Sequence, residues 1–190
     1  NAKVKIGESV VVWGAGGIGL NIIQGASMVS ANPIIAIDLT DEKLDLATKM
    51  GATHSVNINK MKPEDVIFNI VGKNGADVVI DNTGDVDIIN RAYGITNEKG
   101  KTILVGVPPT GKEVKLFTLP LHFEKILSGS HGGESKPNID ISNYINLYNI
   151  GKLKLDKLIT ARYSLEEINK AILDVRQGYT SGRCMLNISN

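Results

Sequence analysis

The chain is poor in cysteine and histidine, which limits its metal chemistry and its compartment. Its 190 residues include one cysteine and three histidines. A single cysteine cannot form an internal disulfide and fits a reducing compartment, so we expect a cytoplasmic protein. The four residues are widely spaced and give no zinc-ligand pattern, so we expect no metal site here; they are Cys184, His54, His122 and His131.

The chain also lacks an excess of charge and a long hydrophobic run. Its formal net charge is +1, with no long basic segment, and we expect neither nucleic acid nor a membrane as a partner. No apolar stretch is long enough to cross a bilayer. The chain begins with Asn1 and not with Met. We therefore expect a piece of a longer protein, whose targeting signals would lie outside this sequence.

Glycine, by contrast, is abundant, and three of the 20 glycines form the most informative motif. A predicted buried strand, Ser9–Trp13, runs into Gly14-Ala15-Gly16-Gly17-Ile18-Gly19, and a helical pattern follows. In such a Gly-x-Gly-x-x-Gly motif the glycines permit a tight turn, close approach of a pyrophosphate and close helix–strand packing. Free N–H groups at the helix start can hold phosphates. We predict dinucleotide binding at Gly14, Gly16, Gly17, Ile18 and Gly19; a glycine-rich turn without a ligand is the alternative.

An acid at the expected distance strengthens this prediction. A second buried strand, residues 33–37, ends at Asp38, which lies 19 residues after Gly19. An acid in this place hydrogen-bonds the hydroxyls of the adenosine ribose. A carboxylate repels a 2′-phosphate, and Leu39 follows it where an arginine would favour NADP, so we expect NAD. A solvated acid at a strand end is the alternative.

Strands and helices alternate along the next hundred residues. We predict further strands at 54–58, 76–81, 101–107 and 125–129, and helices at 41–50, 63–72 and 87–93. This order predicts an α/β fold, a Rossmann-type doubly wound parallel sheet of about six strands. The glycine motif, Asp38, the turn 81–84 and Val105-Gly106 all follow strand ends, where dinucleotides bind.

The pattern changes near residue 136. There we predict a C-terminal helix-strand-helix-strand extension: a helix at 139–148, a strand at 157–163, a helix at 165–176 opened by a Ser164/Glu167 capping box, and a strand at 183–188. We therefore divide the chain into a dinucleotide-binding domain, 1–135, and an extension, 136–190.

Several segments together resemble the second half of zinc-type alcohol dehydrogenases, in the medium-chain dehydrogenase/reductase family. These segments are Val12–Gly19, Asp38 with Lys43, Met50–Thr53, Val105–Pro109, Leu158–Thr160 with Leu165–Ala171, and Gly178 with Ser181–Arg183. The resemblance implies NAD as cofactor and hydride transfer with a small alcohol-type substrate. It also implies that zinc and the catalytic residues lie in an N-terminal domain absent from this chain. The chain alone should then be inactive, and its last fifty or so residues partly uncovered.

The resemblance also assigns roles to particular residues. It implies that Lys43 meets the adenosine ribose and that Arg183 meets the pyrophosphate, where a fork of donors suits phosphate. Thr83 and Gly84 would line the adenosine side of the cleft. The nicotinamide would be contacted by Val105, Gly106, Val107, Ser130 and His131. Simpler interpretations stay open. Lys43 and Arg183 could be surface residues, and Thr83 and Gly84 could form a generic turn. Val105 and Val107 could be core residues, and His131 could have no catalytic role.

Two other functions remain open for this chain. The chain could belong to a zinc-free quinone-reductase-type enzyme, which Asp38 disfavours because such enzymes usually use NADPH, or to an NAD-sensing module without chemistry.

We expect a homodimer that pairs the end strands of two sheets, with Glu113–Pro120 leading into Ile126–Ser128 as the candidate edge. Pro120 and the nearby charges oppose edge pairing, and a bare extension is a rival source of association.

Overall fold

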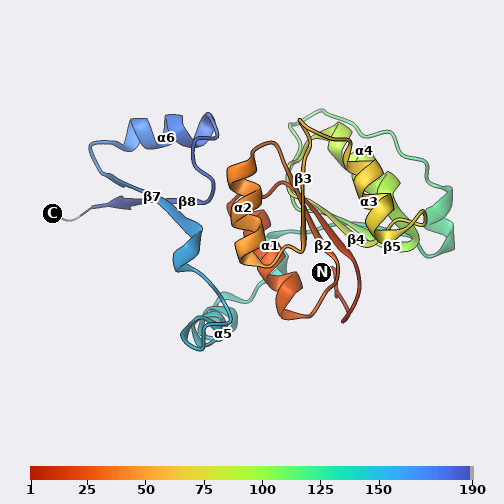
Figure 1. Cartoon of the computed structure of the whole chain (residues 1–190), viewed down its shortest axis with the longest axis horizontal. Coiled ribbons are helices and arrows are strands. Elements are labelled where there is room, and N and C mark those ends of the chain that lie inside the picture. Colours follow the sequence, from red (N-terminus) through yellow and green to blue (C-terminus); the bar gives the residue numbers. More distant parts are fainter. Residues whose placement is uncertain (189–190) are drawn as a thin grey trace.

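Runs of β-branched residues form the centre of the molecule, a parallel sheet of six strands (Figure 1). The computed structural model describes residues 1–188. The strands are β1 (Val10–Trp13), β2 (Ile34–Asp38), β3 (His54–Asn57), β4 (Ala76–Asp81), β5 (Thr96–Leu104) and β6 (Ile126–Gly129), in the order β3-β2-β1-β4-β5-β6. All neighbouring pairs are parallel. The predicted doubly wound Rossmann-type sheet is confirmed.

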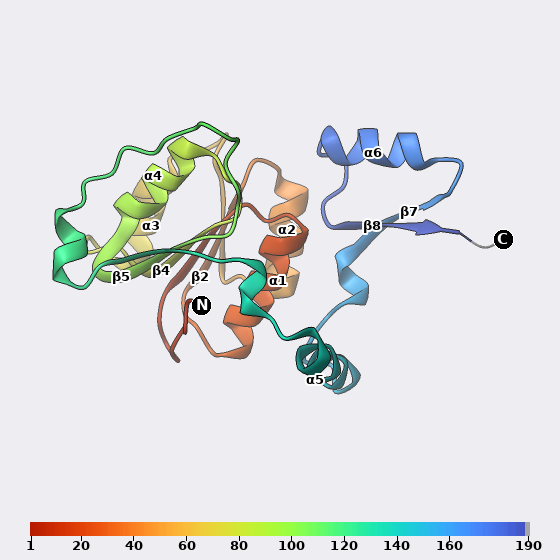
Figure 2. The same ribbon diagram turned by 180° about the vertical axis from the view of Figure 1, so that it is seen from behind.

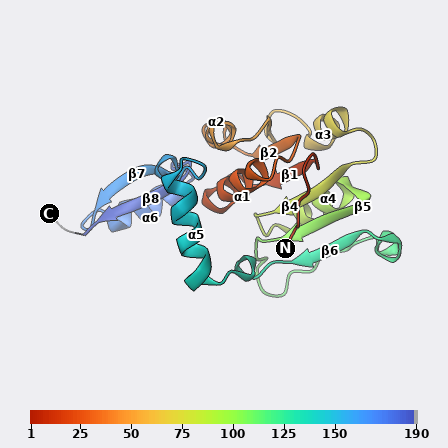
Figure 3. The same ribbon diagram turned by 90° about the horizontal axis from the view of Figure 1, so that it is seen from below.

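Helices cover both faces of this sheet (Figure 3). α1 (Gly17–Met28) and α2 (Asp41–Met50) lie on one face, and α3 (Pro63–Val71) and α4 (Val86–Ile95) lie on the other. Alternate side chains of β1 divide between the two cores: Val10 and Val12 pack toward α1 and α2, and Val11 and Trp13 toward α3 and α4. Burial on both faces explains why the strand is a continuous apolar run.

Three predicted boundaries differ from the structure by three residues or more: both ends of the fifth strand and the start of the last helix. The fifth strand begins at Thr96 and ends at Leu104. Val105 still donates its N–H to the Asp81 carbonyl oxygen, as the parallel register requires, but Gly106 donates to the same oxygen and so leaves the ladder. Helix α6 (Ile168–Arg176) begins later than the capping box predicts. Glu167 does accept the Ser164 N–H, at 3.0 Å, but tight turns precede Ile168.

The C-terminal extension forms a lobe beside α1 and α2 (Figure 2). It contains α5 (Pro137–Asn149), a short 3₁₀ turn η3 (Asp156–Leu158), β7 (Ile159–Ser164), α6 and β8 (Arg183–Asn187). β7 and β8 pair in parallel as a separate sheet. α5 buries no residue, and apolar side chains of α6 such as Leu173 are about half exposed. The uncovered surface expected for this region is therefore present.

The first part of the segment predicted as a dimer edge, Glu113–Pro120, is not a strand, whereas the second part, Ile126–Ser128, lies within β6. Residues 113–118 have no regular structure, and a 3₁₀ turn, η1 (Leu119–Phe123), follows. The edge strands of the large sheet are β3 and β6. Within residues 1–188, no helix is both long and apolar enough to cross a membrane.

Candidate cofactor cleft

The order of the strands reverses between β1 and β4, and a cavity of about 490 Å³ opens at their carboxyl ends. This volume is within the usual range for small-molecule sites. Its walls come from the carboxyl ends of β1, β2, β3 and β4 and from the first turns of α2 and α4. They include Trp13, Gly14, Gly16, Asp38, Leu39, Lys43, Ile58, Thr83, Asp85 and Ile88.

The glycine-rich loop joins β1 to α1 at the edge of this cavity. Gly14 has a φ of +89°, which L side chains rarely adopt. A Cβ on Gly19 would overlap the Gly14 carbonyl oxygen, so the third glycine is needed for the helix to pack against the loop. Helix α1 begins at Gly17 with no acidic residue in its first turn. Its N–H groups are therefore well placed to attract an anion.

Arg183 approaches the same loop from the other end of the chain. A Cβ on Gly17 would lie 2.7 Å from the Arg183 Cζ, so the guanidinium packs directly over this glycine. The side chain is thus brought to the N-terminus of α1, where its donors suit a phosphate. The steric requirement at Gly17 is a feature that the sequence pattern does not reveal.

Asp38 lies at the end of β2, and its carboxylate contacts the glycine-rich loop. One oxygen accepts the Ala15 N–H at 2.7 Å, and the other accepts the Leu39 N–H at 2.7 Å. The Lys43 ammonium is 3.6 Å from Asp38 Oδ1. The Asp38 side chain is only 7% exposed, so these contacts hold its carboxylate at the cavity wall. Each oxygen retains a lone pair for a further donor.

Five apolar side chains line the cavity without having been predicted as site residues: Trp13, Ile37, Leu39, Ile58 and Ile88. Leu39, Ile58 and Ile88 come from three separate segments and line the same space as Asp38. Leu39 is 57% exposed at the cavity. The only sequence signal was its place directly after Asp38. Such walls suit the flat faces of an aromatic base.

The turn after β4 connects the cavity to the end of β5. The Asp81 carboxylate accepts hydrogen bonds from Thr83 and Gly84, and Gly84 has a φ of +72°. Gly106 lies against this turn so closely that a Cβ would meet the Gly84 nitrogen. Thr83 lines the cavity, whereas Val105, Gly106 and Val107 lie outside its walls. Val107 is 87% exposed.

Ser130 and His131 follow β6 and also lie outside the cavity walls. Ser130 donates its N–H to the Leu104 carbonyl oxygen, and its hydroxyl accepts from Asn1 at 3.0 Å. His131 is exposed. The cavity thus gathers Asp38, Lys43 and Thr83 of the residues predicted for the adenosine half, whereas Gly84 lies outside its walls. The residues predicted for the nicotinamide lie along an open face at the ends of β5 and β6.

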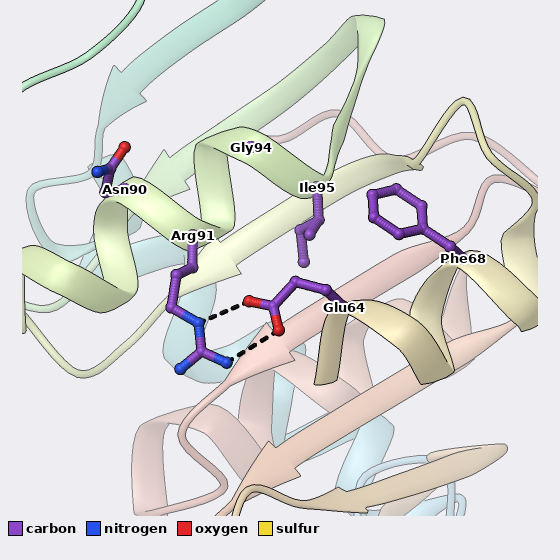
Figure 4. Close-up of a pocket in the computed structure, with 6 residues that line it drawn as sticks. All are labelled: Glu64, Phe68, Asn90, Arg91, Gly94 and Ile95. Carbon is purple, nitrogen blue, oxygen red and sulfur yellow. Dashed lines mark hydrogen bonds and ion pairs between the residues drawn. The ribbon is translucent and has the colours of Figure 1, made fainter. Parts of the chain in front are cut away.

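A second hollow, of about 340 Å³, lies between α3 and α4 (Figure 4). Its charged groups satisfy each other: Arg91 Nε lies 2.6 Å from Glu64 Oε1, and Arg91 Nη2 lies 3.0 Å from Glu64 Oε2. These hydrogen bonds hold the pKa of Glu64 below its usual range. The Arg91 guanidinium also lies 4.8 Å from the Trp13 ring centre. The pair therefore supports the floor of the cofactor cleft from behind and leaves no charge for a ligand.

Metal ligands do not gather in the described part of the chain. Among residues 1–188, no group of three or more His, Cys, Asp or Glu side chains could hold a metal ion. The residues present therefore do not fit a zinc site.

Known proteins resemble both the sequence and the fold. Residues 17–149 match the family model described as "Zinc-binding dehydrogenase". An alcohol dehydrogenase class-3 of Cereibacter sphaeroides is 36% identical over 89% of this chain, which covers 47% of that protein. The chain thus spans about half the length of this relative.

Among solved structures, benzyl alcohol dehydrogenase of Acinetobacter calcoaceticus is 31% identical, with a TM-score of 0.92 over 99% of this chain and 51% of its own. A zinc-binding dehydrogenase of Sinorhizobium meliloti bound to NADP is 27% identical, with a TM-score of 0.79 over 90% of this chain and 50% of its own.

Proposed function

Because the chain belongs to the zinc-binding dehydrogenase family, we propose that it is the NAD-binding part of a zinc-dependent alcohol dehydrogenase. Its role is to hold the cofactor while a small alcohol-type substrate is oxidised or its product reduced. The bound nicotinamide supplies the hydride acceptor or donor. Residues 1–135 form the dinucleotide-binding domain, and residues 136–190 pack on a catalytic domain outside this chain.

One observation carries the proposal: the Asp38 carboxylate is fixed beside the glycine-rich loop at the wall of a cavity. The glycine motif and the acid of the dinucleotide fingerprint therefore lie side by side in the structure. Asp38 would accept hydrogen bonds from the ribose hydroxyls, and Lys43 would lie beside the same sugar. Gly16, Gly17, Ile18 and Gly19 would offer backbone N–H groups to the pyrophosphate, with Arg183 opposite them. Gly14, whose N–H donates to the Ile37 carbonyl oxygen, would instead provide the tight turn beneath the pyrophosphate.

The remaining residues of the site would serve the two ends of the cofactor. Leu39, Ile58 and Ile88 would enclose the adenine, with Thr83 and Gly84 beside it. Val105, Gly106 and Val107 would lie along the nicotinamide, and Ser130 and His131 would present groups to its amide. No residue of this chain is assigned to the chemical step, because zinc is expected in the separate domain.

The choice of NAD over NADP rests on this chain's own residues, since one solved relative is bound to NADP. An ionised Asp38 repels a 2′-phosphate, and Leu39 provides no positive charge in its place. Isothermal titration calorimetry of the chain with both cofactors tests this proposal. NAD should bind at least tenfold more tightly than NADP, because a charge-assisted hydrogen bond contributes about 1.5–3 kcal/mol. Equal affinities for the two cofactors would contradict the proposal.

Two alternatives make different predictions. A zinc-free quinone-reductase-type enzyme would favour NADPH, and a sensing module would bind NAD within a protein that has no dehydrogenase activity.

The purified chain should contain no stoichiometric zinc and should oxidise no alcohol. Elemental analysis and an alcohol assay check this, and one zinc per chain with turnover would overturn it. We also infer a cytoplasmic location from the lone Cys184.

A further inference from the structure

A buried carboxylate lies beneath the cleft with no role in the function proposed so far. It belongs to Asp81, the last residue of β4, which is 0% exposed. Burying a charged group is costly unless hydrogen bonds replace its water. The hydrogen-bond partners of the Asp81 carboxylate should therefore indicate its role.

All the side-chain partners of Asp81 come from the turn that follows it. Oδ1 accepts the Thr83 N–H at 3.0 Å and the Thr83 hydroxyl at 2.6 Å, and Oδ2 accepts the Gly84 N–H at 3.1 Å. Three donors within three residues fold the chain back over the carboxylate. The conformation of this turn is thus set by one side chain.

The main chain of Asp81 holds a second segment. Its carbonyl oxygen accepts the Val105 N–H at 2.8 Å and the Gly106 N–H at 3.0 Å. These bonds draw the end of β5 onto the turn. A Cβ on Gly106 would lie 2.7 Å from the Thr83 carbonyl carbon, so only glycine allows this approach.

The same turn touches the glycine-rich loop on its other side. Thr83 Cγ2 would lie 3.2 Å from a Cβ placed on Gly14. Three segments that are predicted to bind the cofactor therefore meet over Asp81: the loop after β1, the turn after β4 and the extended chain after β5.

We propose that Asp81 is a positioning residue for the cofactor. Its carboxylate sets the turn at residues 82–84, and the turn sets the spacing between Gly14 and Val105–Val107. Asp81 itself makes no contact with the ligand. The inference rests on the proposed function, because it assigns a role in the binding of NAD.

The chain offers a matched control at the opposite end of the same strand. Asp77 also accepts three hydrogen bonds, from the Ser9 N–H at 2.8 Å, the Ser9 hydroxyl at 2.7 Å and the Asn97 amide at 2.8 Å. It lies near the amino end of β4, away from the cleft. Replacing Asp77 removes similar chemistry without touching the cofactor segments.

The experiment compares Asp81→Asn with Asp77→Asn. Asparagine keeps the shape but replaces one acceptor oxygen with a donor, so at least one N–H or O–H of the network faces another donor. Thermal denaturation should show that both variants are less stable than the wild type. Calorimetric titration with NAD, well below both melting temperatures, should show about tenfold weaker binding for Asp81→Asn and unchanged binding for Asp77→Asn.

The outcomes separate the two proposals. Failure of the wild-type chain to bind NAD would refute the proposed function itself. Normal NAD binding by Asp81→Asn, or equal weakening in both variants, would overturn the positioning role while leaving the proposed function intact.

A milder variant keeps the inference testable if Asp81→Asn does not fold. Thr83→Val removes one donor to the carboxylate from an exposed position. Without nucleotide, amide hydrogen exchange at Gly84 and Gly106 should be faster than in the wild type, because the turn loosens. Unchanged exchange at both amides would overturn the role assigned to Asp81.

Discussion

Two glycines of α1 share a helix but have opposite surroundings. A Cβ on Gly19 would overlap the Gly14 carbonyl oxygen, whereas nothing lies within 4 Å of a Cβ placed on Gly25. The first glycine is needed for the cofactor loop to pack against its helix. The second only adds conformational entropy to the unfolded chain. The same residue type thus has a steric role at one position and a small destabilising effect at the other.

Alanine substitutions at these two positions should change stability in opposite directions. Gly25→Ala should raise the free energy of unfolding by about 0.5–1 kcal/mol, the helix-propensity difference. Gly19→Ala should lower it by about 1–3 kcal/mol, as overpacking does. Urea denaturation of both variants measures this, and a stabilised Gly19→Ala would refute the close packing described for the loop.

Asp38 and Leu39 should decide cofactor choice at the residue scale. The double variant Asp38→Gly with Leu39→Arg removes the repelling carboxylate and adds a phosphate partner. The ratio of NADP to NAD dissociation constants should fall at least tenfold, measured by calorimetric titration. Asp45→Gly with Asp87→Gly, two acids outside the cavity walls, serves as the control. An unchanged ratio in the Asp38 variant would rule out the ribose assignment.

At the scale of elements, the pairing of α3 with α4 depends on one ion pair behind the cleft. Arg91 binds Glu64 through two hydrogen bonds and stacks on Trp13, so it links both helices to the end of β1. The side chains are 34% and 30% exposed, which weakens the pair through solvent screening. We therefore expect a modest contribution that depends on pH.

Glu64→Gln should lower the free energy of unfolding by about 1 kcal/mol or less at pH 7. The pKa of Glu64 is lowered in the folded chain, chiefly by the hydrogen bonds from Arg91. The contribution is therefore present above the unfolded pKa of about 4.3 and is lost as pH falls through the lower folded value. Urea denaturation at pH 7 and pH 3 should show the difference from wild type shrinking in acid.

A control and a contrary result complete this test. Glu113 has no ion pair within residues 1–188, so Glu113→Gln should change stability little at either pH. If the Glu64→Gln difference grew in acid, the assignment of the pKa shift to Arg91 would be wrong.

At the scale of the whole molecule, the extension is attached to the sheet by few contacts. Leu153 and Leu158 are buried, and Lys154 donates its N–H to Gln24 Oε1 and its ammonium to the Lys49 carbonyl oxygen. Much apolar surface remains exposed on α5 and α6. The molecule therefore offers two places for self-association, the edge strand β6 and the uncovered extension.

We predict a homodimer that forms through the β6 edge. Ile126 on this edge is 45% exposed, and Leu165 in the extension is 46% exposed, so the two are matched targets for lysine substitution. Ile126→Lys should convert the dimer to a monomer and Leu165→Lys should not, because charge blocks edge pairing. Light scattering over a dilution series measures both. The opposite pattern would place the association on the extension, and a strict monomer in the wild type would exclude the dimer.

Local patterns in the sequence were sufficient to predict most of the fold and half of the cleft. The alternation of apolar runs and helical periods predicted the six-stranded sheet, and Pro63, Gly51 and Gly72 marked helix ends correctly. The glycine motif and Asp38 identified the dinucleotide fingerprint, because its spacing is imposed by one strand-helix-strand unit. Each of these inferences depends on residues close together in the chain.

Tertiary structure alone decided the features that depend on distant segments. The contact of Arg183 with Gly17, the apolar walls at Leu39, Ile58 and Ile88, and the network over Asp81 bring together residues from separate crossovers. The end of β5 was misplaced because Gly106 donates to the Asp81 carbonyl oxygen, which already accepts the Val105 N–H, instead of continuing the ladder. A sequence reports the propensity of each segment, but hydrogen-bond partners and side-chain neighbours across the sheet exist only once the chain has folded.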